Sequence, residues 1–244
     1  MRPTIFAGKS VLVTGANRGL GQALVEEALR RGAHRVYAGT RQPIKPADER
    51  VLPVMLDVTD RAQIDAALDT VDALDILINN AGVSVPDDLD DRSAVERHLA
   101  VNLYGTLDVT RTFLPLLTHS RGAVVNIVSV GALAAVPVLP AYSISKAAGL
   151  SLTQSLRALL AGRDVSVYAV LPGPIDTEMV RYLDIPKTAP QEVARATLDG
   201  IERGDEDIFP DPMSQSLADG WRGGVTKALE RQNAALVAAE PLAA

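Results

Sequence analysis

A glycine-rich turn between an apolar run and a helical pattern is the feature that most constrains the fold of this chain. Residues 11–21 read VLVTGANRGLG, with glycines at 15, 19 and 21 in the spacing Gly-x-x-x-Gly-x-Gly. Glycine lets a backbone approach a phosphate closely, and the N-terminus of the following helix offers free N–H groups to an anion. An ordinary strand-to-helix connection is the alternative, but the strand before and the helix after favour a dinucleotide-binding turn.

Apolar, β-branched runs recur along the chain and alternate with stretches of helical spacing. The runs lie at 11–14, 35–38, 51–56, 74–78, 123–128 and 165–171. Because they are continuously apolar, they predict strands that are buried on both faces, as in a parallel sheet with helices on each side. We therefore expect an α/β fold with a doubly wound parallel β-sheet flanked by helices, in a single domain that spans residues 1–244.

The composition excludes several classes of function. The chain has no cysteine, so disulfides, thiolate metal sites and cysteine nucleophiles are excluded, and its three histidines lack paired metal-ligand spacing. We therefore expect no metal. A net charge of −6 argues against a nucleic-acid surface, and no apolar run is long enough for a membrane helix. Because the N-terminus also lacks a secretory signal pattern, we expect a cytoplasmic enzyme.

The residues after the second apolar run indicate which dinucleotide would bind. In dinucleotide sites, an acidic residue about twenty positions after the glycine turn usually holds the ribose 2′-hydroxyl of NAD. Here Gly39, Thr40 and Arg41 occupy that point, and no acidic residue follows until Asp48. The Arg41 guanidinium could grip a 2′-phosphate, and Arg18 could add a second positive charge. Solvated surface arginines are the alternative, but their joint placement at the two chain positions that flank the adenosine ribose favours NADP(H) over NAD(H).

Tyr142 and Lys146 lie four residues apart in a stretch with helical spacing, so they share one helix face. A neighbouring ammonium, together with an oxidised nicotinamide, favours the phenolate and lowers the pKa of a tyrosine, which suits proton transfer at neutral pH. Taken alone, the pair could equally be an exposed helical pair. Ser129 ends an apolar run, so it is expected at the carboxyl edge of the sheet, where its hydroxyl could hydrogen-bond a substrate oxygen.

Together these motifs resemble those of the short-chain dehydrogenase/reductase family, in its NADP-preferring branch. The resemblance covers about residues 8–204 and rests on the order and spacing of the motifs. Ser129 precedes Tyr142 by thirteen residues, the separation usual in the family. The resemblance implies a Rossmann-type fold and an oxidoreductase that transfers hydride between a nicotinamide and a carbonyl or alcohol. The matching motifs are the glycine turn, Asp57-Val58, NNAG at 79–82, VNLYG around Asn102, Ser129, YSISK, and LPGPIDT at 171–177.

The resemblance implies a role for each catalytic residue. Tyr142 would be the acid or base on the substrate oxygen, and Ser129 would orient that oxygen. Lys146 would lower the pKa of Tyr142 and hydrogen-bond the nicotinamide ribose. Asn102 would hold a water that links Lys146 to solvent as a proton relay, whereas the alternative for an isolated Asn is a bond to helix backbone.

The resemblance also implies the positions that bind the cofactor NADP. Asp57 and Val58 would meet the adenine, and residues 80–82 would pass beneath the adenosine ribose. Pro172 and Gly173 would let the chain turn under the nicotinamide, and Ile175 and Thr177 would contact its carboxamide and the phosphates. Asn79 is expected to be structural. The full predicted set is Gly15, Asn17, Arg18, Gly19, Leu20, Gly21, Thr40, Arg41, Asp57, Val58, Asn80, Ala81, Gly82, Tyr142, Lys146, Pro172, Gly173, Ile175 and Thr177.

Two segments bear on the substrate. Residues 130–139 are almost wholly apolar, so we expect part of this loop either to line an apolar substrate pocket or to pack against its own neighbours. Residues 178–189 resemble a short version of the family's substrate lid, which suggests an open pocket. Arg181 and Lys187 in this segment are expected to be solvated.

The leading hypothesis is an NADPH-dependent enzyme that reduces an apolar ketone or aldehyde to an alcohol, or catalyses the reverse. A 3-oxoacyl-thioester reductase is the alternative within enzymes, although no basic patch for an acyl-carrier protein is evident. A nucleotide-sensing or regulatory protein on the same fold is the alternative of another class. Such proteins usually lose the Tyr or the Lys, whereas Asn102, Ser129, Tyr142 and Lys146 are all present here.

Assembly is predicted from two helix faces and from the C-terminal segment. The helices that carry Asn102 and Tyr142 keep apolar outer faces, which favours a homodimer. Many relatives end in a seventh strand and a glycine-rich tail that build a tetramer. Residues 205–244 diverge from that pattern, with no seventh strand expected before an alanine-rich helical tail, so a tetramer is possible but less favoured. The apolar positions are Leu103, Leu107, Leu152, Leu156 and Leu159.

Overall fold

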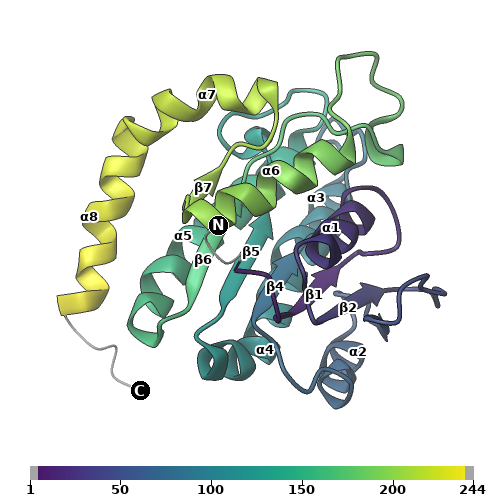
Figure 1. Ribbon diagram of the computed structural model, residues 1–244. Helices are drawn as coiled ribbons and strands as arrows, with labels where there is room; N and C mark the ends of the chain where they lie inside the picture. The colour runs from purple at the N-terminus through teal and green to yellow at the C-terminus, as the bar shows by residue number, and fades with distance from the viewer. Residues whose placement is uncertain (1–4, 240–244) are drawn as a thin grey trace.

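A sheet of seven parallel strands forms the centre of the computed structural model, which describes residues 5–239 (Figure 1). Its spatial order is β3-β2-β1-β4-β5-β6-β7, and all neighbouring strands run parallel, so the predicted doubly wound fold is confirmed. The strands are β1 (Ser10–Thr14), β2 (Arg35–Thr40), β3 (Val51–Met55), β4 (Ile76–Asn79), β5 (Ala123–Ile127), β6 (Ser166–Val170) and β7 (Asp207–Ile208).

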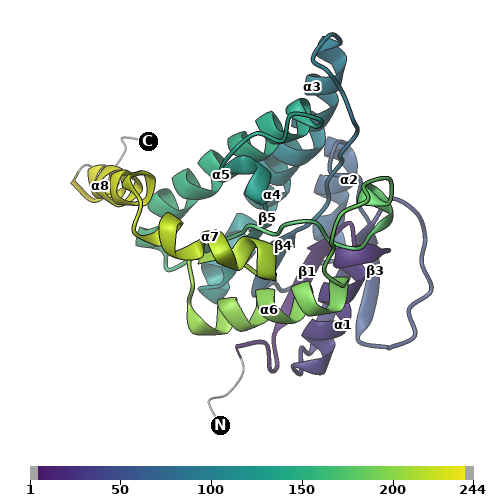
Figure 2. The same ribbon diagram turned by 90° about the horizontal axis from the view of Figure 1, so that it is seen from above.

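Helices cover both faces of the sheet. They are α1 (Gly19–Arg30), α2 (Arg61–Ala66), α3 (Arg92–Leu99), α4 (Thr106–Ser120), α5 (Pro140–Leu160), α6 (Pro190–Arg203), α7 (Pro212–Arg222) and α8 (Val225–Ala239). Figure 2 shows α1 and α6 on one face and α4 and α5 on the other. One apolar cluster joins Leu24 of α1 to Leu198 of α6, and a second joins Phe113 of α4 to Leu156 of α5. No helix within residues 5–239 combines the length and the apolar character needed to cross a bilayer.

Local signals in the sequence set several helix ends. The Asp60 carboxylate accepts hydrogen bonds from the Ala62 and Gln63 N–H groups at the start of α2. Helix α6 begins at Pro190 and stops at Gly204, whose φ of 78° is the left-handed conformation that glycine adopts without strain. These ends are therefore fixed by the residues themselves rather than by distant packing.

The prediction that residues 205–244 add no strand is wrong. Asp207 and Ile208 pair with β6 and extend the sheet by a short seventh strand. Ile208 packs against Gly200 of α6, where an added Cβ atom would lie 2.8 Å from the Ile208 side chain. Two residues are too few to produce an apolar run, so the sequence pattern could not reveal this strand. The predicted helical tail is present as α8.

A chain of buried polar groups crosses the middle of the sheet. Asn79 of β4 and Asn126 of β5 stand opposite each other, and Asn79 Nδ2 donates to Asn126 Oδ1 at 2.9 Å. Asn79 Nδ2 also donates to Thr110 Oγ1 of α4 at 2.9 Å, and Asn126 Nδ2 donates to Thr153 Oγ1 of α5 at 3.0 Å. The chain links two strands to two helices and agrees with the structural role expected for Asn79.

The strand order places a crevice at one point of the sheet. The chain moves from β1 outward to β2 and β3, but from β4 outward to β5 and β6 on the other side. The connections after β1 and β4 therefore diverge, and open α/β sheets bind ligands where this happens. The glycine turn follows β1, and residues 80–83 follow β4.

A buried cluster of charges holds α8 against β7 and α5. Asp207, which is 5% exposed, accepts hydrogen bonds from Arg157 at 2.8 Å, from Lys227 at 2.8 Å and from the Trp221 ring N–H at 2.7 Å. Arg157 also pairs with Glu230 of α8. Burial works to raise the pKa of Asp207, but the charges and hydrogen bonds of its neighbours outweigh burial and hold that pKa below its usual value. The Asp207 carboxylate therefore stays charged in the interior because Arg157 and Lys227 lie beside it.

Replacing Arg157 by Met should lower the free energy of unfolding by about 3 kcal/mol, because removing one partner leaves buried carboxylates short of a cation. Urea denaturation followed by circular dichroism measures the change. The matched control is Arg163→Met, since Arg163 is exposed, and its loss should cost less than about 0.5 kcal/mol. Equal effects in the two variants would show that the cluster does not stabilise the fold.

Candidate active site

A cleft of about 680 Å³ opens at the carboxyl ends of β1 and β4, where the strand order places a crevice. Its lining comes from the glycine turn, the ends of β2 and β3, the loops after β4 and β5, helix α5 and residues 172–180. Every residue predicted to bind the dinucleotide lies along the cleft, and so does Ser129. Asn102 lies behind Gly82, outside this lining. The structure brings the predicted residues together, and their binding of a cofactor stays a prediction.

Glycine is required in the turn for two different reasons. Gly15 has a φ of 66°, which side chains rarely allow. At Gly21 an added Cβ atom would lie 2.1 Å from the Gly15 carbonyl oxygen. Within the described part of the chain, no side chain caps the N-terminus of α1 and no acidic residue stands in its first turn. The turn is therefore a cradle with free N–H groups, and a pyrophosphate fits it.

Asn80 fastens the glycine turn to the end of β4. Its Nδ2 donates to the Thr14 carbonyl at 2.9 Å and to the Gly15 carbonyl at 3.2 Å. In return, Thr14 Oγ1 accepts hydrogen bonds from the Asn80 and Ala81 N–H groups, each at 3.0 Å. The Asn80 side chain thus shapes the cradle, in addition to the place beneath the ribose that the resemblance implies for its backbone.

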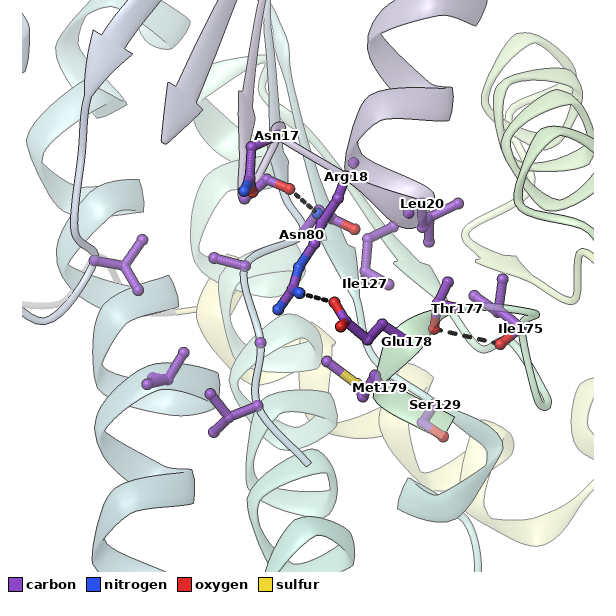
Figure 3. A pocket seen from close by; sticks show the side chains of 18 of the residues that line it. Asn17, Arg18, Leu20, Asn80, Ile127, Ser129, Ile175, Thr177, Glu178 and Met179 are labelled. Atoms are coloured by element: carbon purple, nitrogen blue, oxygen red, sulfur yellow. Dashed lines mark hydrogen bonds and ion pairs between the residues drawn. The ribbon is translucent and has the colours of Figure 1, made fainter. Parts of the chain in front are cut away.

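The two arginines predicted at the 2′-phosphate have different surroundings. Arg18 reaches from the turn and pairs with Glu178 (Figure 3). Arg41 is exposed at the end of β2 and has no ion-pair partner within residues 5–239. Thr40 is buried, and its hydroxyl donates to the Gln42 carbonyl at 2.6 Å. Arg41 could therefore bind an anion directly, whereas Arg18 would first have to leave Glu178.

Ser129, Tyr142 and Lys146 meet beyond the end of β5. Ser129 Oγ accepts a hydrogen bond from the Gly131 N–H at 3.0 Å and donates to the Pro172 carbonyl at 3.5 Å, and it lies near enough to the Tyr142 phenol to lower the pKa of that phenol. Lys146 Nζ donates to the Ile127 carbonyl at 2.8 Å and lies 5.7 Å from the centre of the Tyr142 ring. The three side chains can therefore act on one small group in the cleft.

Burial dominates the protonation of the tyrosine and the lysine. It raises the pKa of Tyr142 above the ordinary value of 10, and the hydrogen bond with Ser129 offsets this only in part. Burial also lowers the pKa of Lys146 from 10.5 to about 8. The ammonium is directed at the Ile127 carbonyl, and the lowering of the Tyr142 pKa by Lys146 beside an oxidised nicotinamide stays a prediction. Tyr142 is thus a protonated phenol at neutral pH.

Asn102 occupies a π-helical turn, Ala100–Gly105, immediately before α4. Its Oδ1 accepts a hydrogen bond from the Val83 N–H at 2.9 Å. Its Nδ2 donates to the Val83 carbonyl at 3.0 Å and to Ser145 Oγ of α5 at 2.9 Å. The side chain therefore ties the loop after β4 to α5. Both amide hydrogens are used, so the relay water implied by the resemblance would have to bind an oxygen of Asn102.

Several residues that shape the site were not predicted from the sequence. His98 is buried, its ring packs edge-on against Tyr142 with 6.4 Å between the ring centres, and its Nε2 accepts a hydrogen bond from the Val85 N–H at 3.1 Å. Glu178 and Met179 form part of the cleft wall (Figure 3). A lone histidine and a short irregular segment carry no spacing signal, so only the fold could reveal them.

Among the described residues, the apolar loop 130–139 contributes nothing to the cleft lining. Val130 and Leu133 join an apolar cluster with Phe209 and Trp221. Packing is therefore shown for the start of the loop, whereas Ala134, Ala135, Pro137 and Val138 are exposed. Apolar side chains of the cleft come from other segments, among them Val83, Val128, Met179 and Val180.

Comparisons with known proteins agree with this geometry. The family model for short chain dehydrogenase matches residues 9–187, more than half of the chain. The oxidoreductase UcpA of Salmonella typhimurium is 34% identical over 212 residues, which cover 78% of this chain and 81% of UcpA. The ketoacyl reductase HetN of Nostoc sp. is 30% identical over 238 residues, which cover 88% of this chain and 83% of HetN.

A solved structure is similar over nearly the whole chain. It is a short chain dehydrogenase from Burkholderia cenocepacia J2315 in complex with NADP, with 39% sequence identity and a TM-score of 0.85. The match covers 93% of this chain and 98% of that one. The likeness therefore extends past the family-model match into the C-terminal segment.

The titration of Lys146 should raise the free energy of unfolding by about 2 kcal/mol between pH 8 and pH 10. Burial places its pKa at about 8 instead of 10.5. In this range the unfolded chain binds more protons than the folded chain, so raising the pH favours the folded state. Urea denaturation of the wild type and of Lys146→Met at each pH isolates this contribution. Parallel pH profiles for the two proteins would contradict the lowered pKa.

Proposed function

Because this chain belongs to the short-chain dehydrogenase family, we propose that it reduces a ketone or aldehyde to an alcohol with NADPH. The observation that carries the proposal is the meeting of Ser129, Tyr142 and Lys146 beside the cleft. Burial raises the pKa of Tyr142, so the phenol holds its proton at neutral pH. A protonated phenol suits donation to a carbonyl oxygen better than removal of a proton from an alcohol, which favours reduction as the direction.

Three observations support NADPH as the cofactor. The end of β2 presents Arg41 and no acidic side chain that could hold a ribose 2′-hydroxyl. Arg18 lines the same cleft. The related Burkholderia structure holds NADP. The N-terminus of α1 would bind the pyrophosphate, Asp57 and Val58 the adenine, and residues 172–177 the nicotinamide.

The catalytic residues would act together on the substrate oxygen. A bound NADPH supplies the hydride, whereas the protein supplies position and a proton. Ser129, whose Oγ is fixed by the Gly131 N–H, would donate a hydrogen bond to the carbonyl oxygen and orient it. Tyr142 would donate its phenolic proton to that oxygen as the alcohol forms. Lys146, with a pKa of about 8, is mostly charged at neutral pH and would stabilise the phenolate that remains.

An uncharged, apolar carbonyl compound is the proposed substrate, because aliphatic and thioether side chains such as Val83, Val128 and Met179 line part of the cleft. A 3-oxoacyl thioester is the second candidate, supported by the similarity to the ketoacyl reductase HetN. The alternative of a regulatory protein is disfavoured, because Ser129, Tyr142 and Lys146 all line the cleft and Asn102 bonds to Ser145, the residue before Lys146.

The proposed assembly is a homodimer through the outer faces of α5 and of α4 with its preceding turn. Leu159 is 43% exposed, and Leu103, Leu107 and Leu152 are half-buried. Leu156, which the sequence placed on this face, is instead buried in the core of its own chain. Light scattering would measure the oligomeric state. The cytoplasmic location stays a prediction that cell fractionation would check.

Replacing Tyr142 by Phe should lower turnover at least about a hundredfold, because the substrate oxygen loses its proton donor. NADPH binding should persist, since the ring remains. Consumption of NADPH against a panel of apolar ketones, aldehydes and a 3-oxoacyl thioester measures turnover, and nicotinamide fluorescence measures binding. The control is Tyr104→Phe, because Tyr104 is exposed and outside the cleft lining. Wild-type turnover in the Tyr142 variant would reject the assigned acid.

NADPH should bind more tightly than NADH, and Arg41→Met should weaken NADPH binding by about tenfold while leaving NADH binding unchanged. The reason is that only NADPH carries a 2′-phosphate for the guanidinium. Titration calorimetry at low salt compares the two cofactors. Arg111→Met, at an exposed position of α4, is the matched control. Tighter binding of NADH to the wild type would contradict the cofactor assignment.

A further inference from the structure

An ion pair joins the lid, residues 178–189, to the glycine turn. Glu178 Oε2 accepts a hydrogen bond from Arg18 Nη1, and both residues line the cleft. Figure 3 shows the Arg18 side chain extending from the turn towards Glu178, with Asn80 alongside. The two partners are 160 positions apart in sequence and belong to different walls of the cleft. The pair therefore joins two walls of the cleft.

Few other contacts tie the lid to the protein. Its base is closed by backbone hydrogen bonds between residues 174–176 and Thr188, at 2.9 and 3.0 Å. Within residues 5–239, the pair of Glu178 with Arg18 is the one ion pair that joins the lid to the rest of the chain. The other lid ion pair, Arg181 with Glu178 at 3.7 Å, is internal. Beyond its base, the lid is held by Arg18 and by the approach of the Tyr182 phenol to Ser84 in the loop after β4.

Arg18 is also one of the two cations that the proposed function directs at the 2′-phosphate. A carboxylate and a phosphate that approach the same guanidinium repel each other, so the two anions compete for it. The Arg18 and Glu178 side chains are 66% and 54% exposed. Because water screens such an exposed ion pair, the pair is weak, and another anion can replace Glu178 at Arg18. A phosphate monoester, with nearly two negative charges and three acceptor oxygens, is the stronger partner.

We propose that Glu178 is a cofactor-selectivity residue, whose carboxylate latches the lid to Arg18 and is exchanged for the 2′-phosphate when NADPH binds. A dinucleotide without that phosphate leaves the pair intact and the lid tied across the cleft. In this proposal the 2′-phosphate of NADPH, which Arg41 would also bind, releases the lid from Arg18, so that the lid can move when the substrate binds. The selectivity part rests on the proposed function, whereas the latch is a property of the protein before any cofactor binds.

The first test compares cofactor affinities. In Glu178→Gln the lid no longer competes for Arg18, so NADPH should bind about threefold more tightly, and NADH binding should not change. Titration calorimetry at low ionic strength measures both dissociation constants. The gain for NADPH should vanish when Glu178→Gln is added to Arg18→Met, because the guanidinium for which the two anions compete is then absent.

Asp184→Asn is the matched control, because it removes one exposed carboxylate from the same lid at a residue with no ion-pair partner within residues 5–239. It should leave the ratio of NADPH to NADH affinity unchanged. Equal tightening of both cofactors in Glu178→Gln would mean a general charge effect and would overturn the proposal. A gain for NADPH that persists without Arg18 would overturn it as well.

The second test needs no cofactor. Amide hydrogen exchange of residues 178–189 in the free protein should rise to the same extent in Glu178→Gln and in Arg18→Met, with no further rise in the double variant. Unchanged exchange in both single variants would reject the latch. A wild type that prefers NADH, but whose lid loosens in both variants, would reject the proposed cofactor and leave the latch standing.

Discussion

The hydrogen bond between Asn79 and Asn126 in the middle of the sheet is the interaction on which the placement of the site depends. It joins β4 to β5, and the same two amides reach Thr110 of α4 and Thr153 of α5. A buried polar group left without a partner costs about 1–3 kcal/mol, so each helix is held in one register against the strands. Helix α5 carries Tyr142 and Lys146, the candidate catalytic pair, and both side chains line the cleft.

The same burial that fixes these helices decides the chemistry of the site. Tyr142 and Lys146 lie in surroundings from which water is largely removed, and desolvation favours the neutral form of both groups. The phenol therefore keeps its proton, while the lysine, with a pKa of about 8, stays mostly charged at neutral pH. A protonated phenol beside a cation is the arrangement that the proposed carbonyl reduction requires, and it follows from how the helices and the sheet pack.

Much of the fold and of the candidate site could be predicted from the sequence, because the signals are local. Continuous apolar runs predicted six of the strands, and the glycine spacing predicted the cradle in which an added Cβ at Gly21 would strike the Gly15 carbonyl. The four-residue spacing of Tyr142 and Lys146 put them on one helix face. Each of these inferences needs only neighbouring residues, whose backbone preferences and periodicity are fixed by the chain itself.

The sequence by itself determined six strands of the sheet, the glycine turn and the candidate catalytic side chains. Only the tertiary structure decided the seventh strand, the direction of the pKa shifts, the contacts of Asn102 and the partner of Arg18. The physical reason is distance along the chain: Arg18 and Glu178 are 160 positions apart, and burial depends on every element that packs around a group. Such contacts leave no periodic trace in the sequence, and they exist only once the chain has folded.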